Sequence, residues 1–405
     1  MSSTSDPDEH SDESLPEPLQ SKGALHDPFE WYERMRSDSP VRYDPQRDVY
    51  DVFTHEHVKR SLQDDDRFVR KELSRSHMSP DDPFSYLDNA MIWSDGPAHK
   101  QGKGQLFEYF RPSMLEGFRE SIEEISESQL QTALESGPEF DFISDFAVPV
   151  PLRVIMDVVG VPQDDHAQML EWLETFRSVM NSEYSAKEST DGDRMEGAVE
   201  YFREVIAERK QTPQDDLISR LAAETDLTDA EIGANCFDFI LAGQGTMSEF
   251  LSNALYLFVE HDLLGDLEAS KLPVVLEEVL RYRTPLQSRA RVTAEPVTLD
   301  GTAISEGETV ILWLGSANRD PAKYEQPEAF VPERDPDHLA FGSGAHTCIG
   351  APLARLQAPI VLETVLDRFD RIEIVEDGIE PKPKASKLGF ERLELSTTPV
   401  RDSRA

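Results

Sequence analysis

The sequence has few of the residues that several common kinds of site require. It contains only two cysteines among 405 residues, Cys236 and Cys348, and neither belongs to a CxxC or CxxCH pattern. A disulfide framework, a zinc ribbon, a cysteine-held iron–sulfur cluster and the covalent cofactor attachment of CxxCH sequences are therefore not expected. Chemistry at a single thiol remains open.

Long hydrophobic runs are also missing. No stretch approaches the roughly 18 uninterrupted apolar residues that a membrane-spanning helix needs, and the N-terminus lacks the apolar core of a signal peptide. We therefore expect a cytoplasmic protein with no membrane contact. The sequence also has no GxSxG, HExxH or GxxxxGK motif and no glycine run of the dinucleotide-binding type, so the chemistries that depend on these motifs are not favoured.

Positive charge is scarce, since 40 Lys and Arg face 79 Asp and Glu and the formal net charge at pH 7 is −39. So negative a chain repels nucleic acid and anionic lipid, and neither is an expected partner. The basic residues are mostly arginine and the acidic residues are spread along the whole chain, as in proteins from salt-loaded cytoplasms. We hypothesise a halophilic protein whose stability requires molar salt to screen carboxylate repulsion; the alternative is an ordinary acidic enzyme.

The pattern of the chain predicts a mainly α protein with a small β-rich region. Residues 1–22 are rich in Ser, Asp, Glu and Pro and are expected to be an acidic disordered tail, and residues 23–405 are expected to form a single domain. A β-hairpin leading into a helix is predicted over 40–58, and short strands over 296–300 and 309–314. Apolar residues recurring at intervals of three and four predict helices over 120–136, 194–210, 229–261, 274–283 and 351–369.

The most specific motif is FGSGAHTCIGAPLARLQ, in which a glycine-rich loop containing Cys348 leads directly into one of these helices. A cysteine at a helix N-terminus faces unpaired backbone N–H groups and the positive end of the helix dipole, which favour the thiolate. Glycines at 342, 344 and 350 permit a tight loop and a close approach of the backbone to a flat cofactor. The alternative is a structural cysteine beside an unrelated glycine loop.

The spacing Phe-x-x-Gly-x-His-x-Cys-x-Gly resembles the haem-binding loop of the cytochrome P-450 family, and the following APLARL continues as in its soluble bacterial members. This resemblance implies the family's helical prism with a small β-rich region, and haem b (iron protoporphyrin IX) as cofactor. It implies further that Cys348 is the axial thiolate ligand of the haem iron and that Phe341 packs near the haem and the sulfur. Gly344 and Gly350 would shape the loop, and His346 would reach a haem propionate.

A second motif is VVLEEVLRYRTP, where Glu278 and Arg281 are three residues apart and share one face of a predicted helix. Alone, such a pair is usually a surface ion pair of little energetic value. It resembles the family's Glu-x-x-Arg helix, whose pair contacts an arginine in a later Phe-x-Pro-x-Arg segment. That segment is present as residues 330–334, so the resemblance implies a structural triad of Glu278, Arg281 and Arg334.

Haem propionates need positive partners, and the resemblance suggests which cations provide them. His99 and Lys103, in WSDGPAHKQGK, are four residues apart on a predicted helix and match a family His/Arg pair, with lysine in place of arginine. Arg291, in LQSRARVTAEPV, matches the family's propionate-binding arginine. Arg289, two residues earlier, is the competing assignment.

The family's oxygen-activating helix matches NCFDFILAGQGTMSEFLSNA, and here the sequence departs from the pattern. Ala242 and Thr246 are present, but the carboxylate that normally precedes the threonine is Gly245, so half of the acid–alcohol pair that passes protons to dioxygen is missing. Gln244, Glu249 or a water chain are candidate replacements for the proton path. Phe239 is a candidate pocket wall, although ordinary core packing explains it equally well.

Together these resemblances imply a haem-thiolate monooxygenase that inserts one oxygen atom from O2 into a hydrophobic small organic substrate. Its electrons would come from a separate ferredoxin and ferredoxin reductase, and the chain is expected to be a monomer. Two alternatives stay open. One is a peroxide-driven peroxygenase, suggested by Gly245, and the other is a non-catalytic haem-binding or sensing protein.

Overall fold

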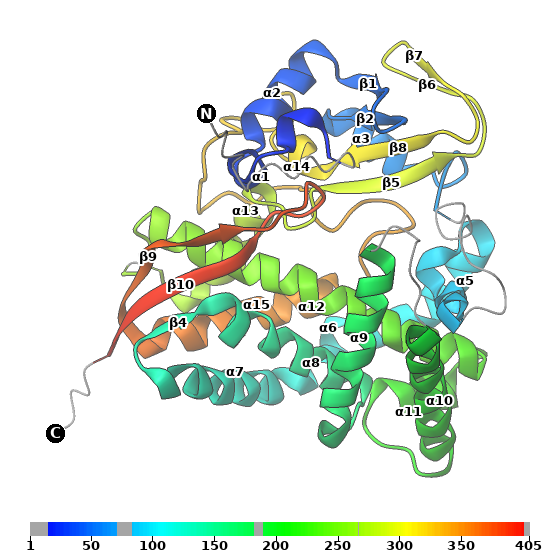
Figure 1. Cartoon of the computed structure of the whole chain (residues 1–405), viewed down its shortest axis with the longest axis vertical. Helices are drawn as coiled ribbons and strands as arrows, with labels where there is room; N and C mark the ends of the chain where they lie inside the picture. The colour runs from blue at the N-terminus through cyan, green and yellow to red at the C-terminus, as the bar shows by residue number, and fades with distance from the viewer. Residues whose placement is uncertain (1–14, 71–82, 182–188, 266, 401–405) are drawn as a thin grey trace, which may run out of the picture.

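The computed structural model describes residues 15–70, 83–181, 189–265 and 267–400. Helices dominate this part of the chain (Figure 1). The α-helices are α1 (Lys22–His26), α2 (Phe29–Asp38), α3 (His55–Gln63), α5 (Gly96–Phe107), α6 (Pro112–Leu115), α7 (Arg119–Ala133), α8 (Pro149–Val159), α9 (His166–Asn181), α10 (Ser189–Gln211), α11 (Leu217–Glu224), α12 (Asp229–Glu260), α13 (Leu272–Tyr282), α14 (Leu314–Ala317) and α15 (Ala351–Arg368).

The strands form a five-stranded, a three-stranded and a two-stranded sheet, in the orders β1-β2-β8-β5-β3, β4-β10-β9 and β6-β7. Only the β2–β8 pairing is parallel within these sheets. The strands are β1 (Val41–Asp44), β2 (Val49–Val52), β3 (Phe68–Val69), β4 (Glu139–Asp141), β5 (Ser288–Thr293), β6 (Val297–Leu299), β7 (Thr302–Ile304), β8 (Thr309–Trp313), β9 (Phe369–Pro381) and β10 (Phe390–Pro399).

The predicted elements are confirmed at the level of type and position. All five helices expected from the apolar spacing are present as α7, α10, α12, α13 and α15, and the predicted hairpin and following helix are β1, β2 and α3. Local sequence explains the start of α12. The Thr228 hydroxyl accepts a hydrogen bond from the Glu231 backbone, and the Glu231 carboxylate accepts one from the Thr228 backbone. This capping box satisfies two of the helix's unpaired N–H groups.

The last residues of the expected disordered tail, 15–22, have a defined structure. Residues 1–14 lie outside the described residues, but the chain is described from Leu15 and contains a short 3₁₀ turn at Glu17–Leu19 before α1. Leu19 is 1 % exposed and packs in a small cluster with Trp31, Tyr32 and Trp313. Leu15 also packs against this cluster, so apolar contacts hold a segment whose acidic composition suggested disorder.

The hydrophobic core is largest around α12, which crosses the middle of the helical part of the molecule (Figure 1). Of its 32 residues, those on both sides of a central stretch are almost all buried, and it contacts α8, α10, α13 and α15. A second core cluster lies under the five-stranded sheet, whose strand β5 carries two arginines toward the helical part. These two cores position α12, β5 and the segment before α15 around one site.

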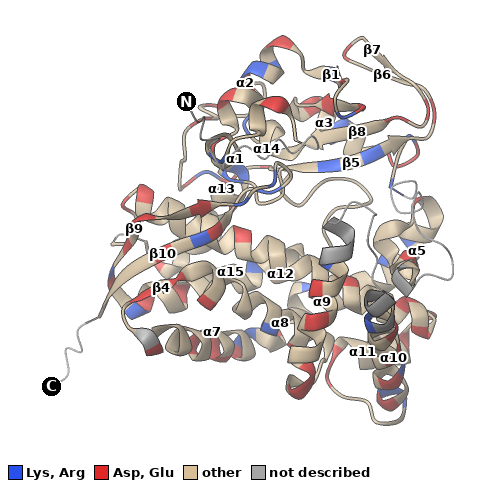
Figure 2. Cartoon of the chain, in the orientation of Figure 1, with Lys and Arg blue, Asp and Glu red and all other residues tan. Residues whose placement is uncertain are grey.

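Acidic side chains are distributed over the helices and turns of the molecule, as Figure 2 shows for α7 and α10, whereas β5 carries arginine. In the part of the chain that the structure describes, no helix is both long enough and apolar enough to cross a bilayer.

Candidate active site

The loop before α15 is folded tightly around Cys348. The Cys348 backbone N–H donates to the Phe341 carbonyl oxygen at 2.8 Å, and the Thr347 N–H donates to that of Gly344 at 3.1 Å. Gly342 and Gly344 have φ values of +74° and +76°, a region that favours glycine. A Cβ atom at Gly344 would lie 2.5 Å from the Leu62 carbonyl oxygen at the end of α3. Gly342 and Gly344 thus form the predicted tight loop, while the approach of the loop to a cofactor stays a prediction.

The Cys348 thiol is accessible to solvent, and yet the surrounding protein shifts its pKa. Burial is the largest influence and raises its pKa, while N–H groups of Gly350 and Ala351 and the charges of Arg289 and Lys103 act in the opposite direction. A side chain that is accessible and desolvated at once faces a space enclosed by protein. The helix N-terminus favours the thiolate as expected, but it does not outweigh burial for the free thiol; metal coordination would deprotonate it.

His99 and Lys103 lie on α5 beside this loop, and they support its backbone. The Lys103 ammonium donates to the carbonyl oxygens of Ala345 and Thr347, both at 2.6 Å. The two ring nitrogens of His99 face the carbonyl oxygens of Met91 at 3.0 Å and Ala345 at 3.1 Å. Both ring nitrogens of His99 thus face carbonyl oxygens of the protein, and the Lys103 ammonium retains one N–H; the propionate contacts of both residues stay predictions.

His346 stacks against His99 with ring centroids 3.9 Å apart, and its Nε2 is 3.1 Å from Asp95 Oδ1. Its Nδ1 is buried without a hydrogen-bond partner. Burial lowers the pKa of His346 to about 4, with Asp95 opposing and His99 and nearby arginines reinforcing the shift. A neutral imidazole that donates Nε2–H to Asp95 has a lone pair at Nδ1, so this nitrogen can accept a hydrogen bond, whereas an anionic group there would require the protonated ring.

Three arginines converge near His346. Arg289 and Arg291 alternate along β5 and so point to the same side of the strand. Burial, together with repulsion from Arg70, lowers the pKa of Arg291 to about 9 and that of Arg289 to about 10. Arg291 donates to the Ala290 carbonyl oxygen at 2.8 Å. The Arg289 side chain is exposed and, among the described residues, its guanidinium has no hydrogen bond or ion pair, although Asp238 attracts it electrostatically.

This donor set fits haem. Three mutually repelling guanidinium groups require anionic partners, and two propionates would supply them. The accessible thiol of Cys348 lies close enough to Arg289 for the two to interact electrostatically. Arg289 and Arg291 both remain candidates for the propionates. In the described part of the chain no group of three or more His, Cys, Asp and Glu could hold a metal ion by itself.

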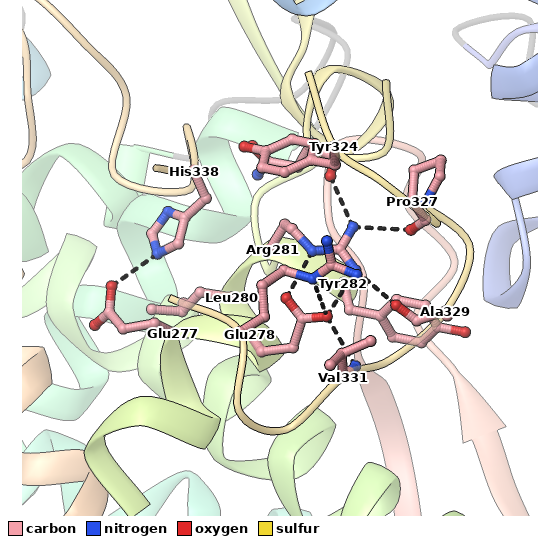
Figure 3. A network of polar contacts seen from close by, with 12 residues as sticks. Glu277, Glu278, Leu280, Arg281, Tyr282, Tyr324, Pro327, Ala329, Val331 and His338 are labelled. Atoms are coloured by element: carbon pink, nitrogen blue, oxygen red, sulfur yellow. Dashed lines mark hydrogen bonds and ion pairs between the residues drawn. The ribbon is translucent and has the colours of Figure 1, made fainter. Parts of the chain in front are cut away.

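The predicted triad is present, and Figure 3 shows its Glu278 and Arg281. Glu278 and Arg281 are both 0 % exposed, and Arg281 donates from Nε to Glu278 at 2.7 Å and from Nη2 at 2.8 Å. Arg334 Nε donates to the same carboxylate at 3.1 Å. The remaining donors of Arg281 reach the carbonyl oxygens of Asn318, Pro327 and Ala329. The pair is thus a fully buried crosslink, and not the surface ion pair that spacing alone would suggest.

A second ionic group lies next to the triad and was not anticipated from the sequence. Glu277 accepts hydrogen bonds from Arg355 of α15 at 2.7 and 2.9 Å, and its other neighbour is His338 at 3.0 Å (Figure 3). Although burial opposes the effect, Arg355 and His338 hold the pKa of Glu277 at about 2. Arg355 also lies over the Phe341 ring, 4.6 Å from its centroid. Arg355 of α15 therefore contacts both α13 and the cysteine loop.

The middle of α12 faces the site from the other side. Within a helix that is otherwise almost entirely buried, Ala242 is exposed and Thr246 is half-buried. The Thr246 hydroxyl donates to the Ala242 carbonyl oxygen at 3.0 Å, so the two residues are paired along one face. Phe239 packs edge-on against Phe110 with centroids 5.0 Å apart, which supports the core-packing interpretation of that residue.

Gln244 does not share this face. Its side chain is 7 % exposed, and its amide oxygen accepts a hydrogen bond from Arg177 of α9. Two residues along a helix correspond to about 200°, so Gln244 points away from Thr246. The expectation that Gln244 serves the proton path beside Thr246 is corrected by this arrangement.

Two contributors to the site were missed from the sequence. Arg70, at the end of β3, lies over Trp93 with its guanidinium carbon 4.9 Å from the ring centroid, and its Nε is buried without a partner. Asp95 accepts a hydrogen bond from the Arg70 backbone at 2.9 Å as well as contacting His346. The one available signal was Asp95 immediately before α5, a typical position for a helix-capping residue.

Comparison with known proteins gives the same family throughout. The family model described as "Cytochrome P-450" matches residues 18–264 and 271–398. The biotin biosynthesis cytochrome P-450 of Bacillus subtilis is 32 % identical over 389 residues, covering 91 % of this chain and 95 % of that protein. The solved structure of CYP109E1 from Bacillus megaterium with testosterone is 31 % identical with a TM-score of 0.81, covering 93 % and 99 % of the two chains. The structure of P-450BioI with acyl carrier protein ligated to hexadec-9Z-enoic acid is 30 % identical with a TM-score of 0.84, covering 93 % and 100 %.

Proposed function

Because the chain belongs to the cytochrome P-450 family, we propose that it hydroxylates a small hydrophobic organic substrate with electrons from a ferredoxin and its reductase. Family membership itself makes the protein a haem b monooxygenase. The overall reaction consumes the substrate, O2, two electrons and two protons, and yields the hydroxylated substrate and water. The electron donor and the substrate class are the proposed parts.

The residues of the site divide the work of holding the cofactor. Cys348 would ligate the iron, and its thiolate would donate electron density that favours O–O cleavage. The N–H groups of Gly350 and Ala351 and the charge of Lys103 stabilise negative charge on that sulfur. Arg70, together with Arg291 or Arg289, would hold the propionates, because these mutually repelling guanidinium groups lack a sufficient set of anionic protein partners; His346 would join them only with its ring protonated.

On the substrate side, the accessible stretch of α12 supplies the contacts. Ala242 would contribute an apolar wall, and the Thr246 hydroxyl would be the hydrogen-bond donor nearest the reacting centre. The ligands named for two similar proteins, testosterone for CYP109E1 and a hexadecenoic acyl chain for P-450BioI, are both largely hydrophobic. They support a hydrophobic small molecule as substrate here.

The observation that carries this proposal is the accessible Cys348 thiol at the N-terminus of α15, and the absorption spectrum of the reduced, carbon-monoxide-bound protein tests it. We expect the strongly red-shifted Soret band of a thiolate complex, and we expect Cys348→Ser to lose both the band and turnover. Cys236→Ser is the matched control, because that cysteine is fully buried in α12. An unshifted band in folded wild-type protein would refute the ligand assignment.

A peroxide-driven reaction is the second candidate, and Gly245 is the observation that favours it, because peroxide brings its own protons and electrons. Product formation with NADH, reductase, ferredoxin and O2 can be compared with product formation from hydrogen peroxide alone. Tight coupling of NADH to product supports the monooxygenase, and turnover confined to peroxide supports the alternative. Either form of turnover removes the non-catalytic haem-binding alternative.

We propose further that the chain is a monomeric cytoplasmic protein that contacts no nucleic acid or membrane and is adapted to salt. The formal charge of −39 supports the adaptation to salt, because carboxylate repulsion opposes compaction unless ions screen it. The melting temperature should rise by several degrees between dilute and molar KCl. A melting temperature that does not change would exclude the salt requirement.

A further inference from the structure

The accessible stretch of α12 has a charged group beside it. Residues 241–246 are the only part of α12 between Ile232 and Phe258 in which most residues are accessible, and they lie in the middle of a buried helix. A Cβ atom at Gly245 would lie 3.1 Å from the Lys387 ammonium nitrogen. The ammonium therefore lies directly over the glycine that precedes Thr246.

Lys387 is held in this position by its backbone. It lies in the turn between β9 and β10, and that turn pairs with the segment between α13 and β5. The Gln287 N–H donates to the Ser386 carbonyl oxygen at 2.8 Å, and the Leu388 N–H donates to that of Pro285 at 2.9 Å. These bonds fix the residues on both sides of Lys387, so its side chain reaches α12 from a supported position.

Several cations gather around Lys387, although the chain as a whole carries −39. Lys387 and Lys382 donate to the same oxygen, Glu249 Oε1, at 3.2 and 3.0 Å. Arg177 bonds to the neutral amide of Gln244 and is attracted electrostatically by Glu249 as well as by Glu174 on its own helix. Glu249 is the buried carboxylate of this described cluster: its Oε1 accepts from both lysines, its Oε2 has no partner, and Glu174 also acts on Arg177.

We propose that the substrate carries a carboxylate and that Lys387 binds it over Gly245, with the apolar body of the substrate along Ala242 and Thr246. This rests on the proposed monooxygenase function. The ammonium has three N–H donors and gives one to Glu249, so two remain for a two-oxygen head group. Glycine at 245 leaves that ammonium uncovered on the α12 side, where any larger residue would contact it.

The test compares an acid with its neutral analogue. Binding of decanoic acid and of decan-1-ol to the ferric holoenzyme is measured by the Soret shift and by equilibrium dialysis. Lys387→Met should weaken decanoic acid binding about tenfold to a hundredfold, the value of one charge-assisted contact, and change decan-1-ol binding less than about twofold. Gly245→Asp should also weaken decanoic acid binding selectively, because the new carboxylate would form an ion pair with the Lys387 ammonium.

Lys382→Met is the matched control, since it removes the other ammonium from Glu249 Oε1 without touching Gly245. Its affinity for decanoic acid should stay within about twofold of wild type. Three results would overturn the proposal: equal losses in the two lysine variants, equal losses for acid and alcohol, or a selective loss in Arg289→Met instead. Wild-type protein that binds no decanoic acid would overturn it as well.

The reduced carbon-monoxide spectrum is recorded for each variant in the same samples. A normal thiolate band with unselective binding refutes only the role of Lys387. Loss of the band in wild-type protein refutes the proposed function itself, so the two failures are distinguishable.

Discussion

The two sides of the site differ in how their polar groups are paired. On the side of α13 and α15, Arg281 uses all five of its N–H donors, and the Glu278 carboxylate accepts from Arg281, Arg334 and the Val331 backbone. On the side of α12, Arg289 has no hydrogen bond or ion pair within the described chain, and Glu249 Oε2 is buried without a partner. The polar groups of the first side are paired within the protein, whereas polar groups on the second side lack protein partners and can bind other molecules.

This difference follows from what each side must do. A thiolate ligand has to stay in one place, and a buried, fully paired ion network has no alternative partners to which it can shift. A site that exchanges substrates needs accessible surface and groups that gain partners on binding. Substitutions that remove ion pairs from the first side test whether this difference is real. A substitution that removes a charge from the second side tests how large the difference is.

The largest effect is expected for Arg281→Ala, which leaves the Glu278 carboxylate buried with too few partners. Loss of one member of such a buried pair costs about 3–5 kcal/mol, so urea unfolding should show a large drop in midpoint. Arg334→Ala is the matched control, because its side chain is 17 % exposed and makes only one of the contacts to Glu278. Equal losses in the two variants would contradict the view that burial sets the value of this network.

A smaller effect is expected for the glycines of the cysteine loop. Gly342→Ala and Gly344→Ala both place a side chain at positive φ, which costs on the order of 1 kcal/mol. Only Gly344→Ala also meets a backbone oxygen at 2.5 Å, since the nearest atom at Gly342 is 3.7 Å away. We expect Gly344→Ala to lose more stability and more bound haem, measured as the ratio of Soret to protein absorbance. If Gly342→Ala is the more damaging variant, close packing against α3 is not what fixes the loop.

A third effect, confined to the pH dependence of stability, is expected on the α12 side for Asp238→Asn. Burial raises the pKa of Asp238 from 3.8 to about 6, although Arg70 and Arg289 oppose the shift. The folded protein therefore keeps a proton that the unfolded chain loses, so this group stabilises the fold at low pH and that contribution is lost as pH rises to about 6. Its size is on the order of 2 kcal/mol. The unfolding free energy of wild type should fall between pH 4.5 and 6.5, and Asp238→Asn should lack the part of this fall that Asp238 causes. Parallel pH profiles of the two proteins would contradict this assignment.

Several parts of the molecule could be predicted from the sequence because they depend on local spacing. The helices α12, α13 and α15 follow from apolar periodicity, and the cysteine loop from the positions of Cys348 and its glycines. Glu278 and Arg281 were predictable as a pair, because three residues along a helix bring them to one face. Their complete burial was not predictable, since burial depends on the 324–334 segment that packs over them.

The sequence by itself therefore determined the family, the haem b cofactor that the family uses and the order of the elements, because these are set by residue types at fixed offsets along the chain. Only the tertiary structure decided where the polar groups are directed. Gln244 bonds to α9, His99 supports the loop, and Lys387 reaches α12 from a turn more than 130 residues away. The physical reason is that a charge finds its partners through space and not along the chain, so the elements must be packed before its neighbours are known.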